Sequence, residues 1–280
     1  MKTRLIALPS FLLCAAMSFA QLQLELSREL IRHTLVLRNF YTAQKLRFGQ
    51  DGTLISGEGA RGFGPIDGRV YVEAVQLDAN RLMIRGERPV SLFDPATGET
   101  RLLGLRSKVE IEVDLPLDAD EPQTRAALDR VFFTPAEADA FECSSEEASA
   151  FRDRMLRSKA TVSVRKEKAG DDRAPQQLCF PGGSRAYIAE SAVEPPKPLK
   201  THDPAYPASM AGKPQDKTVV LALIVDPTGR PASFVVIAAA PTMFELAALD
   251  AVQHWRFLPA SYHEKPVPAA INVEVNFKYP

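Results

Sequence analysis

The clearest pattern of hydrophobic and polar positions lies in residues 202–280. Residues 217–225 form a nearly unbroken aliphatic run rich in valine, which predicts a strand. Residues 226–229, Asp-Pro-Thr-Gly, place proline second and glycine fourth, the order typical of a type I turn. Residues 231–238 are again mostly apolar. The two runs therefore predict a β-hairpin.

An amphipathic helix is predicted after this hairpin. Its apolar positions recur at spacings of three and four residues, which places them on one helical face. These positions are Phe244, Ala247, Ala248, Ala251, Val252 and Trp255. Thr242 and Glu245 have the spacing of a capping box, so the helix is expected to begin with Thr242 as its cap. Glu245 and His254 fall off the apolar face, and Pro259 is expected to end the helix.

The last segment of the chain alternates between apolar and polar residues. The apolar positions are Ile271, Val273, Val275, Phe277 and Tyr279, and the polar positions between them are Asn272, Glu274, Asn276 and Lys278. This alternation predicts a strand with one face buried and the other in water. A sheet with a helix packed on one face is the simplest two-layer arrangement of these elements.

In their order and in their residues these segments resemble the TonB C-terminal domain family. The matching segments are Asp-Pro-Ala-Tyr-Pro at 203–207, the hairpin around Gly229, the helix with its Trp-Arg-Phe-Leu-Pro-Ala ending at 247–260, and Pro266-Val267 followed by the last strand. The family has a tyrosine-proline pair before its first strand and a Trp-Arg-Phe-x-Pro-Ala segment after its helix. The resemblance covers residues 200–280 and implies a three-stranded antiparallel sheet with helices on one face.

The preceding part of the chain predicts a β-rich unit. Strand-like runs occupy residues 34–40, 44–48, 52–56, 69–77, 81–86 and 109–113. Turn signals such as Asp51-Gly52 separate them. Short strands at such intervals are typical of a small sandwich or a barrel, and the pattern does not distinguish the two.

Composition changes after this β-rich region. Residues 122–133 and 136–156 are rich in Ala, Glu, Arg and Leu, which favours helices, with Thr134 as a cap and Pro135 in the first turn. We expect these helices to pack against the β-rich unit. Residues 166–190 are polar and contain glycines, so a loop is expected there. The fold class is therefore α+β, with a β-rich domain and its added helices followed by the TonB-like domain.

The first twenty residues have the features of a secretory signal. Lys2 and Arg4 precede an apolar stretch that ends in Ser-Phe-Ala at 18–20, a small-x-small cleavage signal. The apolar stretch is shorter than the ~20 residues that a membrane span needs. We expect cleavage after Ala20 and export to the periplasm of a Gram-negative envelope; the alternative is an uncleaved inner-membrane anchor.

The expected domains follow from these boundaries. They are a signal peptide at 1–20, the β-rich domain with a helical C-terminal part at 21–190, a proline-rich linker at 191–203 and the TonB-like domain at 204–280. Export places Cys143 and Cys179 in an oxidising compartment, where the two cysteines are expected to form a disulfide. The alternative is a pair of buried free thiols. Leu13 before Cys14 argues against a lipoprotein, because the residue at that position has to be small.

Charge and candidate chemistry exclude several function classes. The chain has 34 basic and 35 acidic residues and no basic stripe, which argues against nucleic-acid binding. The Gly-x-Gly-x-x-Gly match at 57–62 is followed by residues 63–68, which cannot open the helix that a nucleotide site requires. The four histidines have no metal-ligand spacing, although His254 and His263 flank the helix end and could meet. We therefore expect no catalytic residues, no metal and no cofactor, and no enzyme activity.

The resemblance implies a function for the last strand. In the family, a short segment of an outer-membrane TonB-dependent transporter pairs with the final strand by β-augmentation. The corresponding residues here are Ile271, Asn272, Val273, Glu274, Val275, Asn276, Phe277, Lys278 and Tyr279. The expected function is thus that of a periplasmic protein supporting TonB-type transport. The alternatives are an envelope structural or interaction protein that reuses the fold, and a small-ligand binder acting through the β-rich domain.

Overall fold

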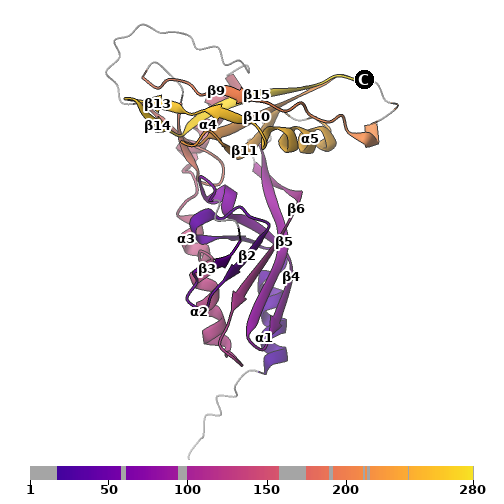
Figure 1. The fold of residues 1–280 in the computed structure, drawn as a ribbon, viewed down its shortest axis with the longest axis vertical. Coiled ribbons are helices and arrows are strands. Elements are labelled where there is room, and N and C mark those ends of the chain that lie inside the picture. The colour runs from indigo at the N-terminus through magenta and orange to yellow at the C-terminus, as the bar shows by residue number, and fades with distance from the viewer. Residues whose placement is uncertain are drawn as a thin grey trace, which may run out of the picture.

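The structure of the protein is a computed structural model. It describes residues 18–57, 61–93, 100–157, 175–188, 192–210, 212, 215–238 and 240–279. Figure 1 shows an elongated N-terminal unit standing below a C-terminal unit that lies across its upper end. The predicted fold class, α+β with a β-rich unit before a TonB-like unit, is confirmed.

The elements follow the chain in two groups. The N-terminal unit contains α1 (Phe19–Leu30), β1 (Thr34–Val36), η1 (Arg38–Phe40), β2 (Lys45–Phe48), β3 (Leu54–Ser56), η2 (Pro65–Gly68), β4 (Arg69–Asp78), β5 (Arg81–Phe93), β6 (Thr100–Asp114), α2 (Glu121–Val131) and α3 (Pro135–Asp139). The C-terminal unit contains α4 (Ser145–Arg157), β7 (Gln177–Cys179), β8 (Arg185–Ile188), β9 (Lys197–Lys200), η3 (Ala208–Met210), β10 (Lys217–Val225), β11 (Pro231–Ala238), α5 (Thr242–Val252), β12 (Arg256–Leu258), β13 (Ala260–Tyr262), β14 (Lys265–Val267) and β15 (Ala269–Phe277).

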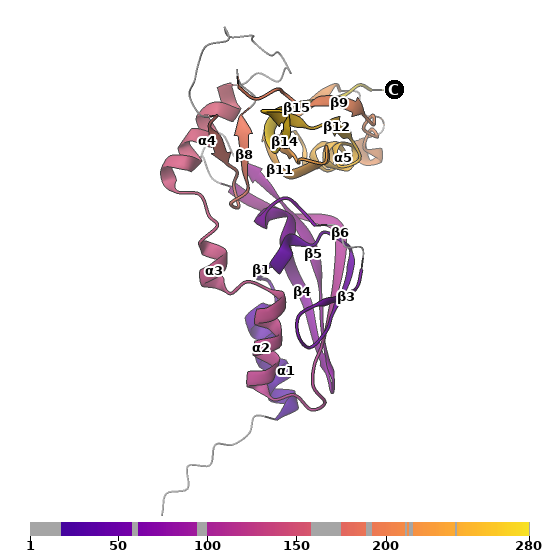
Figure 2. The same ribbon diagram turned by 60° about the vertical axis from the view of Figure 1, so that its left-hand side comes forward.

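The N-terminal unit is an open sheet with helices on one face, and neither a sandwich nor a barrel. Its strands lie in the order β1-β4-β5-β6-β2-β3, with β4, β5 and β6 antiparallel and β2 parallel to β6. Figure 2 shows α1 and α2 side by side along one side of these strands. The strand patterns predicted most of these strands, although residues 38–40 form a 3₁₀ turn. The helix expected over residues 122–133 packs against the sheet as α2, as predicted.

Helix α1 was not predicted from the sequence. Ser18 caps it by accepting the backbone N–H of Gln21 at 3.3 Å, and Leu22, Leu26 and Leu30 recur every four residues and are buried. They pack in the same hydrophobic core as the strand residues. The expected cleavage after Ala20 falls within the first turn of this helix.

The opposite face of the N-terminal sheet carries paired charges. Arg85 contacts Glu110 at 2.8 Å, and Lys108 contacts Glu73 at 2.9 Å and Glu87 at 2.6 Å. A charged face of this kind remains in water and is not covered by a second sheet. The two-layer arrangement therefore replaces the sandwich or barrel that strand spacing alone suggested.

The C-terminal unit contains the predicted three-stranded antiparallel sheet. The order is β11-β10-β15, and β10 pairs with β11 as the expected hairpin. The turn is fixed by the Asp226 carboxylate, which accepts the N–H groups of Thr228 at 2.7 Å and Arg230 at 2.9 Å. Gly229 has φ +81°, and a Cβ there would lie 2.0 Å from the carbonyl oxygen of Phe257, so only glycine fits this position.

Helix α5 packs on one face of this sheet, but its ends differ from the prediction. Its N-cap is Pro241, and no side chain caps it, so Thr242 is the first helical residue and the predicted capping box is wrong. Glu245, which falls off the apolar face, is nevertheless buried. The helix ends at Val252, and Trp255 lies beyond it, half-buried, with its indole N–H donating to the carbonyl of His202 at 2.9 Å.

The second face of the C-terminal sheet is also partly covered. Phe151 of α4 and Phe180 after β7 pack with Ala222, Ile224 and other residues of β10 and β11. Helix α4 therefore covers the C-terminal sheet, whereas the sequence placed it against the β-rich unit (Figure 2). Residues 177–179 and 185–188, expected within a loop, form β7 and β8. Cys143 and Cys179 are joined by a disulfide, which attaches β7 to the start of α4.

The segment expected as a linker lies on the C-terminal unit. Residues 197–200 pair with β12 as strand β9, and Glu194 bridges to Ser261. Val193 is buried against Ala260 and Ala269. Its prolines keep the segment extended. In this conformation its backbone pairs with the C-terminal unit, so the segment does not act as a free linker between the two units.

Candidate partner-binding edge

Strand β15 lies at the edge of the C-terminal sheet for most of its length. It pairs with β10 from Ala269 to Phe277. On its other side, β8 pairs with it only at Ala269 and Ala270. Within the described part of the chain, no strand continues that pairing beyond Ala270. The backbone from Ile271 to Phe277 can therefore accept an added strand.

The hydrogen bond to β8 shows which backbone groups face this open edge. Tyr187 donates its N–H to the carbonyl of Pro268 at 2.9 Å. Backbone groups of alternate residues in a strand point to the same side, so the even-numbered residues of β15 direct theirs away from β10. The N–H and C=O groups of Glu274 and Asn276 consequently lie at the open edge. Those of Val273 and Val275 face β10.

The side chains of 271–279 divide between two faces as the alternation predicted, except at Asn272 and at Tyr279, which lies beyond the end of β15 and is 40% exposed. Val273, Val275 and Phe277 are buried on the α5 side, and Glu274, Asn276 and Lys278 are exposed. Asn272, expected in water, is only 9% exposed. It lies opposite Ala222, which packs with Phe151 and Phe180 in the layer that α4 and β7 add to this face. The exposed polar face therefore begins at Glu274.

Two polar contacts hold the far end of the strand. Thr218 donates its hydroxyl to Asn276 Oδ1 at 2.7 Å, across the pair that β10 and β15 form there. The backbone N–H of Tyr279 donates to the Asp216 carboxylate at 3.2 Å. These contacts order the strand to its end without using the even-numbered backbone groups.

Tyr206, in the segment before β10, packs against the residues at the end of β15. Its ring makes edge-to-face contacts with Phe244 at 5.4 Å and with Tyr279 at 5.6 Å between ring centroids. Its hydroxyl donates to the carbonyl of Gln215 at 3.2 Å. These contacts give Tyr206 a packing role.

The opposite edge of the C-terminal sheet is partly covered by the N-terminal unit. β11 pairs in parallel with the end of β5, Val235 with Ser91 and Val236 with Leu92. The two units thereby share one continuous sheet. Within the described residues, β5 takes up the middle of β11, so the longest unpaired run of edge in the C-terminal sheet is on β15.

A buried carboxylate lies at the junction of the two units. Asp67 Oδ1 accepts the N–H of Ser233 at 2.9 Å, and Oδ2 accepts the Ser233 hydroxyl at 3.2 Å and the N–H groups of Phe63 and Gly64 at 2.9 and 3.1 Å. Asp67 belongs to the single 3₁₀ turn η2, which forms where the sequence excluded a helix. Burial raises the pKa of this carboxyl, and the four hydrogen bonds oppose that rise. The sequence analysis did not identify Asp67, because no local sequence pattern distinguishes it from other aspartates.

Arg88 is the buried cation beside this carboxylate. Its guanidinium donates to the carbonyls of Asp67 at 3.2 Å and Ala43 at 3.0 Å. Burial lowers the pKa of Arg88 to about 10, and the charge of Asp67 acts in the opposite direction. The arginine remains charged at neutral pH, so this cluster holds β5 against the η2 turn and fixes the junction.

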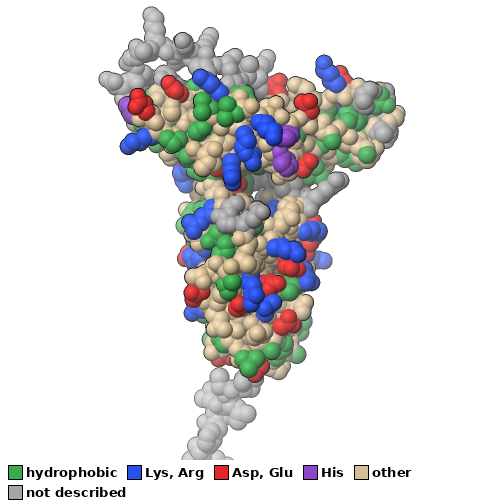
Figure 3. Space-filling view, viewed as in Figure 1, with side chains coloured by type: hydrophobic (Ala, Val, Ile, Leu, Met, Phe, Trp, Pro, Cys, Tyr) green, Lys and Arg blue, Asp and Glu red, His purple; other side chains and the backbone are tan. Residues whose placement is uncertain are grey.

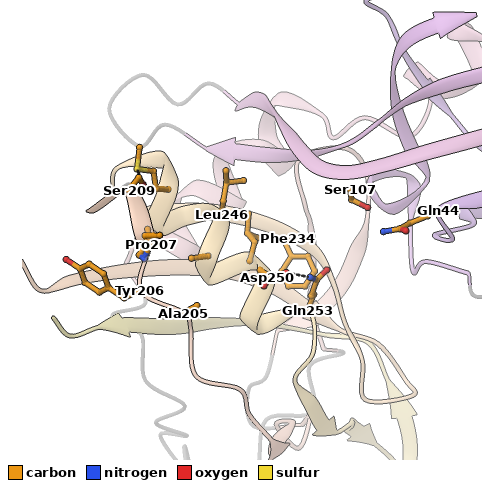
Figure 4. Close-up of a pocket in the computed structure, with 14 residues that line it drawn as sticks. Gln44, Ser107, Ala205, Tyr206, Pro207, Ser209, Phe234, Leu246, Asp250 and Gln253 are labelled. Atoms are coloured by element: carbon orange, nitrogen blue, oxygen red, sulfur yellow. Dashed lines mark hydrogen bonds between the residues drawn. The ribbon is translucent and has the colours of Figure 1, made fainter. Parts of the chain in front are cut away.

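A groove lies where α5 faces the N-terminal unit. Figure 4 shows Leu246 and Asp250 of α5 and Phe234 of β11 on one side, with Gln44 and Ser107 across from them. Its volume is about 720 Å³. The Gln253 amide donates to the Asp250 carboxylate at 2.9 Å, so these polar groups satisfy each other. The described residues that line the groove present no set of convergent polar groups of the kind that orients a small ligand.

The histidines do not form the contact considered from the sequence. His254 stacks edge-to-face on His202, with 5.9 Å between ring centroids, rather than on His263. Among the described residues, no group of three His, Cys, Asp or Glu side chains is placed to hold a metal ion. In the same residues, no helix is long and apolar enough to cross a membrane.

The C-terminal unit is thus an interaction-type domain: an antiparallel sheet with helix α5 on one face and an open edge along most of β15. Residues 202–279 match the family described as the Gram-negative bacterial TonB protein C-terminal domain, which confirms the resemblance for this segment. Among solved structures, the TonB C-terminal domain of Pseudomonas aeruginosa, studied by NMR in solution, is similar over 31% of this chain and 88% of that chain. The sequence identity is 25% and the TM-score is 0.27. No curated protein matches the chain.

The family sets the general role of the C-terminal unit. Its members are interaction domains of the cell envelope that take part in transport. Residues 202–279 therefore form a TonB-like interaction domain. The match does not extend into the N-terminal unit.

Proposed function

We propose that this protein is exported to the periplasm and binds an extended segment of an outer-membrane transporter, or of another envelope protein, by strand addition to β15. The observation that carries the proposal is the open edge from Ile271 to Phe277, whereas β5 pairs with the middle of the opposite edge strand, β11. Backbone hydrogen bonds supply affinity in such pairing, and the side chains on alternate positions supply selectivity.

The open edge restricts the partner's geometry. β8 occupies the same side of β15 at Ala269 and Ala270, so an added strand has to end where β8 begins. Side chains of the added strand that point toward the α5 face lie beside Val273, Val275 and Phe277. Those that point to the opposite face lie beside Glu274, Asn276 and Lys278. A partner segment with alternating apolar and polar residues fits both faces.

Amide hydrogen exchange resolved by residue tests this proposal. In the free protein, the amides of Glu274 and Asn276 should exchange rapidly, because they face the open edge. Those of Val273 and Val275 should be protected by β10. Saturation with a peptide from the amino end of a TonB-dependent transporter should protect Glu274 and Asn276 and leave the other two unchanged. Rapid exchange of Glu274 and Asn276 at saturating peptide would refute strand addition.

A further inference from the structure

The two-stranded ribbon of β9 and β12 carries unpaired positive charge. Lys200 lies opposite Arg256, and Lys197 lies opposite Leu258. All four side chains are exposed. Among the described residues, no carboxylate forms an ion pair with any of these three cations. On the N-terminal sheet, by contrast, Lys108 and its neighbours contact carboxylates directly.

Large aliphatic side chains lie among these cations. Leu199 is 69% exposed and Leu258 is 50% exposed. The pairing shifts by one residue at Leu199, between the Arg256–Lys200 and Phe257–Pro198 pairs. In such a bulge two neighbouring residues lie opposite one residue of the partner strand, so Leu199 and Lys200 share the outer side of the ribbon. Phe257, the inward residue of β12, is buried in the core.

Contacts with the folded unit fix the ribbon in place. The N–H of Phe257 donates to the carbonyl of Gly229 at 2.9 Å, so the 226–230 turn supports it from one side. Arg230, the residue after Gly229 in this turn, is also an exposed cation. His202 and His254 stack at its end. Figure 3 shows Lys and Arg side chains gathered beside histidines on the C-terminal unit, whereas both signs of charge are interspersed on the N-terminal unit.

We propose that this ribbon docks the C-terminal unit onto an anionic phospholipid surface. Lys197, Lys200 and Arg256 would contact the headgroups, and Leu199 and Leu258 would enter the boundary between headgroups and acyl chains. The two exposed leucines favour a lipid surface over an acidic peptide as the partner. A hydrophilic acidic peptide would use the cations alone, whereas exposed leucines between the cations also gain free energy at a surface with an apolar layer beneath the charge. The proposal is independent of strand addition at β15.

Sedimentation of the full-length exported protein with vesicles tests the proposal. The protein should bind vesicles of phosphatidylethanolamine and phosphatidylglycerol, fail to bind phosphatidylcholine vesicles, and dissociate at high salt. Arg256→Gln and Lys200→Gln should each lower the partition coefficient about fivefold, since one basic residue near such a surface contributes ~1 kcal/mol. Arg28→Gln is the matched control, because Arg28 is an exposed arginine on α1 at the other end of the molecule.

The leucines provide the second comparison. Leu199→Ser with Leu258→Ser keeps every charge and should lower the partition coefficient by about tenfold or more. Absence of binding to anionic vesicles at low salt would overturn the proposal, as would equal losses in Arg256→Gln and Arg28→Gln. Unchanged binding in the leucine variant, with equal binding to soluble polyglutamate, would also overturn it and would indicate an acidic peptide as the partner.

Discussion

The carboxylate of Asp67 accepts the backbone N–H of Ser233 at 2.9 Å, although 166 positions separate the two residues. Ser233 has φ +52°, a left-handed conformation that few side chains adopt, and it lies where the pairing of β11 with β10 shifts register. Its hydroxyl contacts both Asp67 and Ser184, at 3.2 and 2.9 Å. The carboxylate of one unit thus stabilises a strained position in the other.

Removal of this carboxylate should destabilise the protein strongly. Asp67→Ala leaves the buried N–H groups of Ser233 and Gly64 without their acceptor, and we expect a loss of about 3 kcal/mol or more in the free energy of unfolding. Urea unfolding measures it. Asp51→Ala is the matched control, because Asp51 accepts the N–H of Thr53 at 3.0 Å in an exposed turn and should lose at most about 1 kcal/mol. Equal losses in the two variants would contradict the structural role of Asp67.

The raised pKa of Asp67 gives this stabilisation a pH dependence. The folded state holds the proton more tightly than the unfolded state, so stability falls as pH rises from the ordinary carboxyl pKa of 3.8 through the raised folded pKa. Asp67→Asn removes this titration. The difference in unfolding free energy between the native protein and Asp67→Asn should therefore shrink from pH 4 to pH 7, as followed by urea unfolding at each pH. A difference that grows over this range would contradict the direction of the shift.

Loss of the disulfide should loosen the layer that α4 and β7 form. Cys143→Ser with Cys179→Ser removes a cross-link that spans 36 positions, and the chain-entropy estimate is a loss of about 3–4 kcal/mol. Reductant should shift the unfolding midpoint of the native protein and leave the double variant unchanged. Peptide mapping that finds both thiols free in protein purified from the periplasm would show that the bond does not form there.

Proline substitutions should separate binding from folding along β15. Asn276→Pro removes an N–H at the open edge, and binding of the transporter peptide should be lost while the domain still melts cooperatively. Val275→Pro removes a donor to β10 and should destabilise the domain itself. Asn276→Ala is the control, because it removes the contact with Thr218 and keeps the N–H. Glu274→Ala should cost at most about 1 kcal/mol in binding. Full peptide binding by Asn276→Pro would count against the edge geometry.

The amino terminus of the exported protein should be Gln21. Cleavage after Ala20 removes Ser18, the cap of α1, and leaves the buried Leu22, Leu26 and Leu30 to hold the helix on the sheet. Intact mass of the protein from the envelope fraction measures the terminus. A mass that begins at Met1 would support the anchored alternative.

Local patterns predicted the C-terminal domain well because each of its elements carries its own signal. Alternation in 271–279 predicted the buried face of β15, and the 226–229 turn predicted the hairpin. The ends of α5 were less predictable: a capping box needs Thr242 to precede the helix, and Pro241 holds that position instead. Asn272 is buried because Phe151 and Phe180 cover its end of the sheet, and both precede Asn272 by more than ninety positions.

The sequence by itself determined that the chain ends in a TonB-like domain with a half-buried last strand, because helix and strand periodicities are local properties. Only the tertiary structure decided which edge is open. β5 pairs with the middle of β11, β8 pairs with the first two residues of β15, and the rest of β15 is left for a partner. The order of the strands depends on contacts between segments far apart in the chain, and so does the hydrogen bond from the strained residue Ser233 to Asp67. The periodicity within each segment contains no information about such contacts.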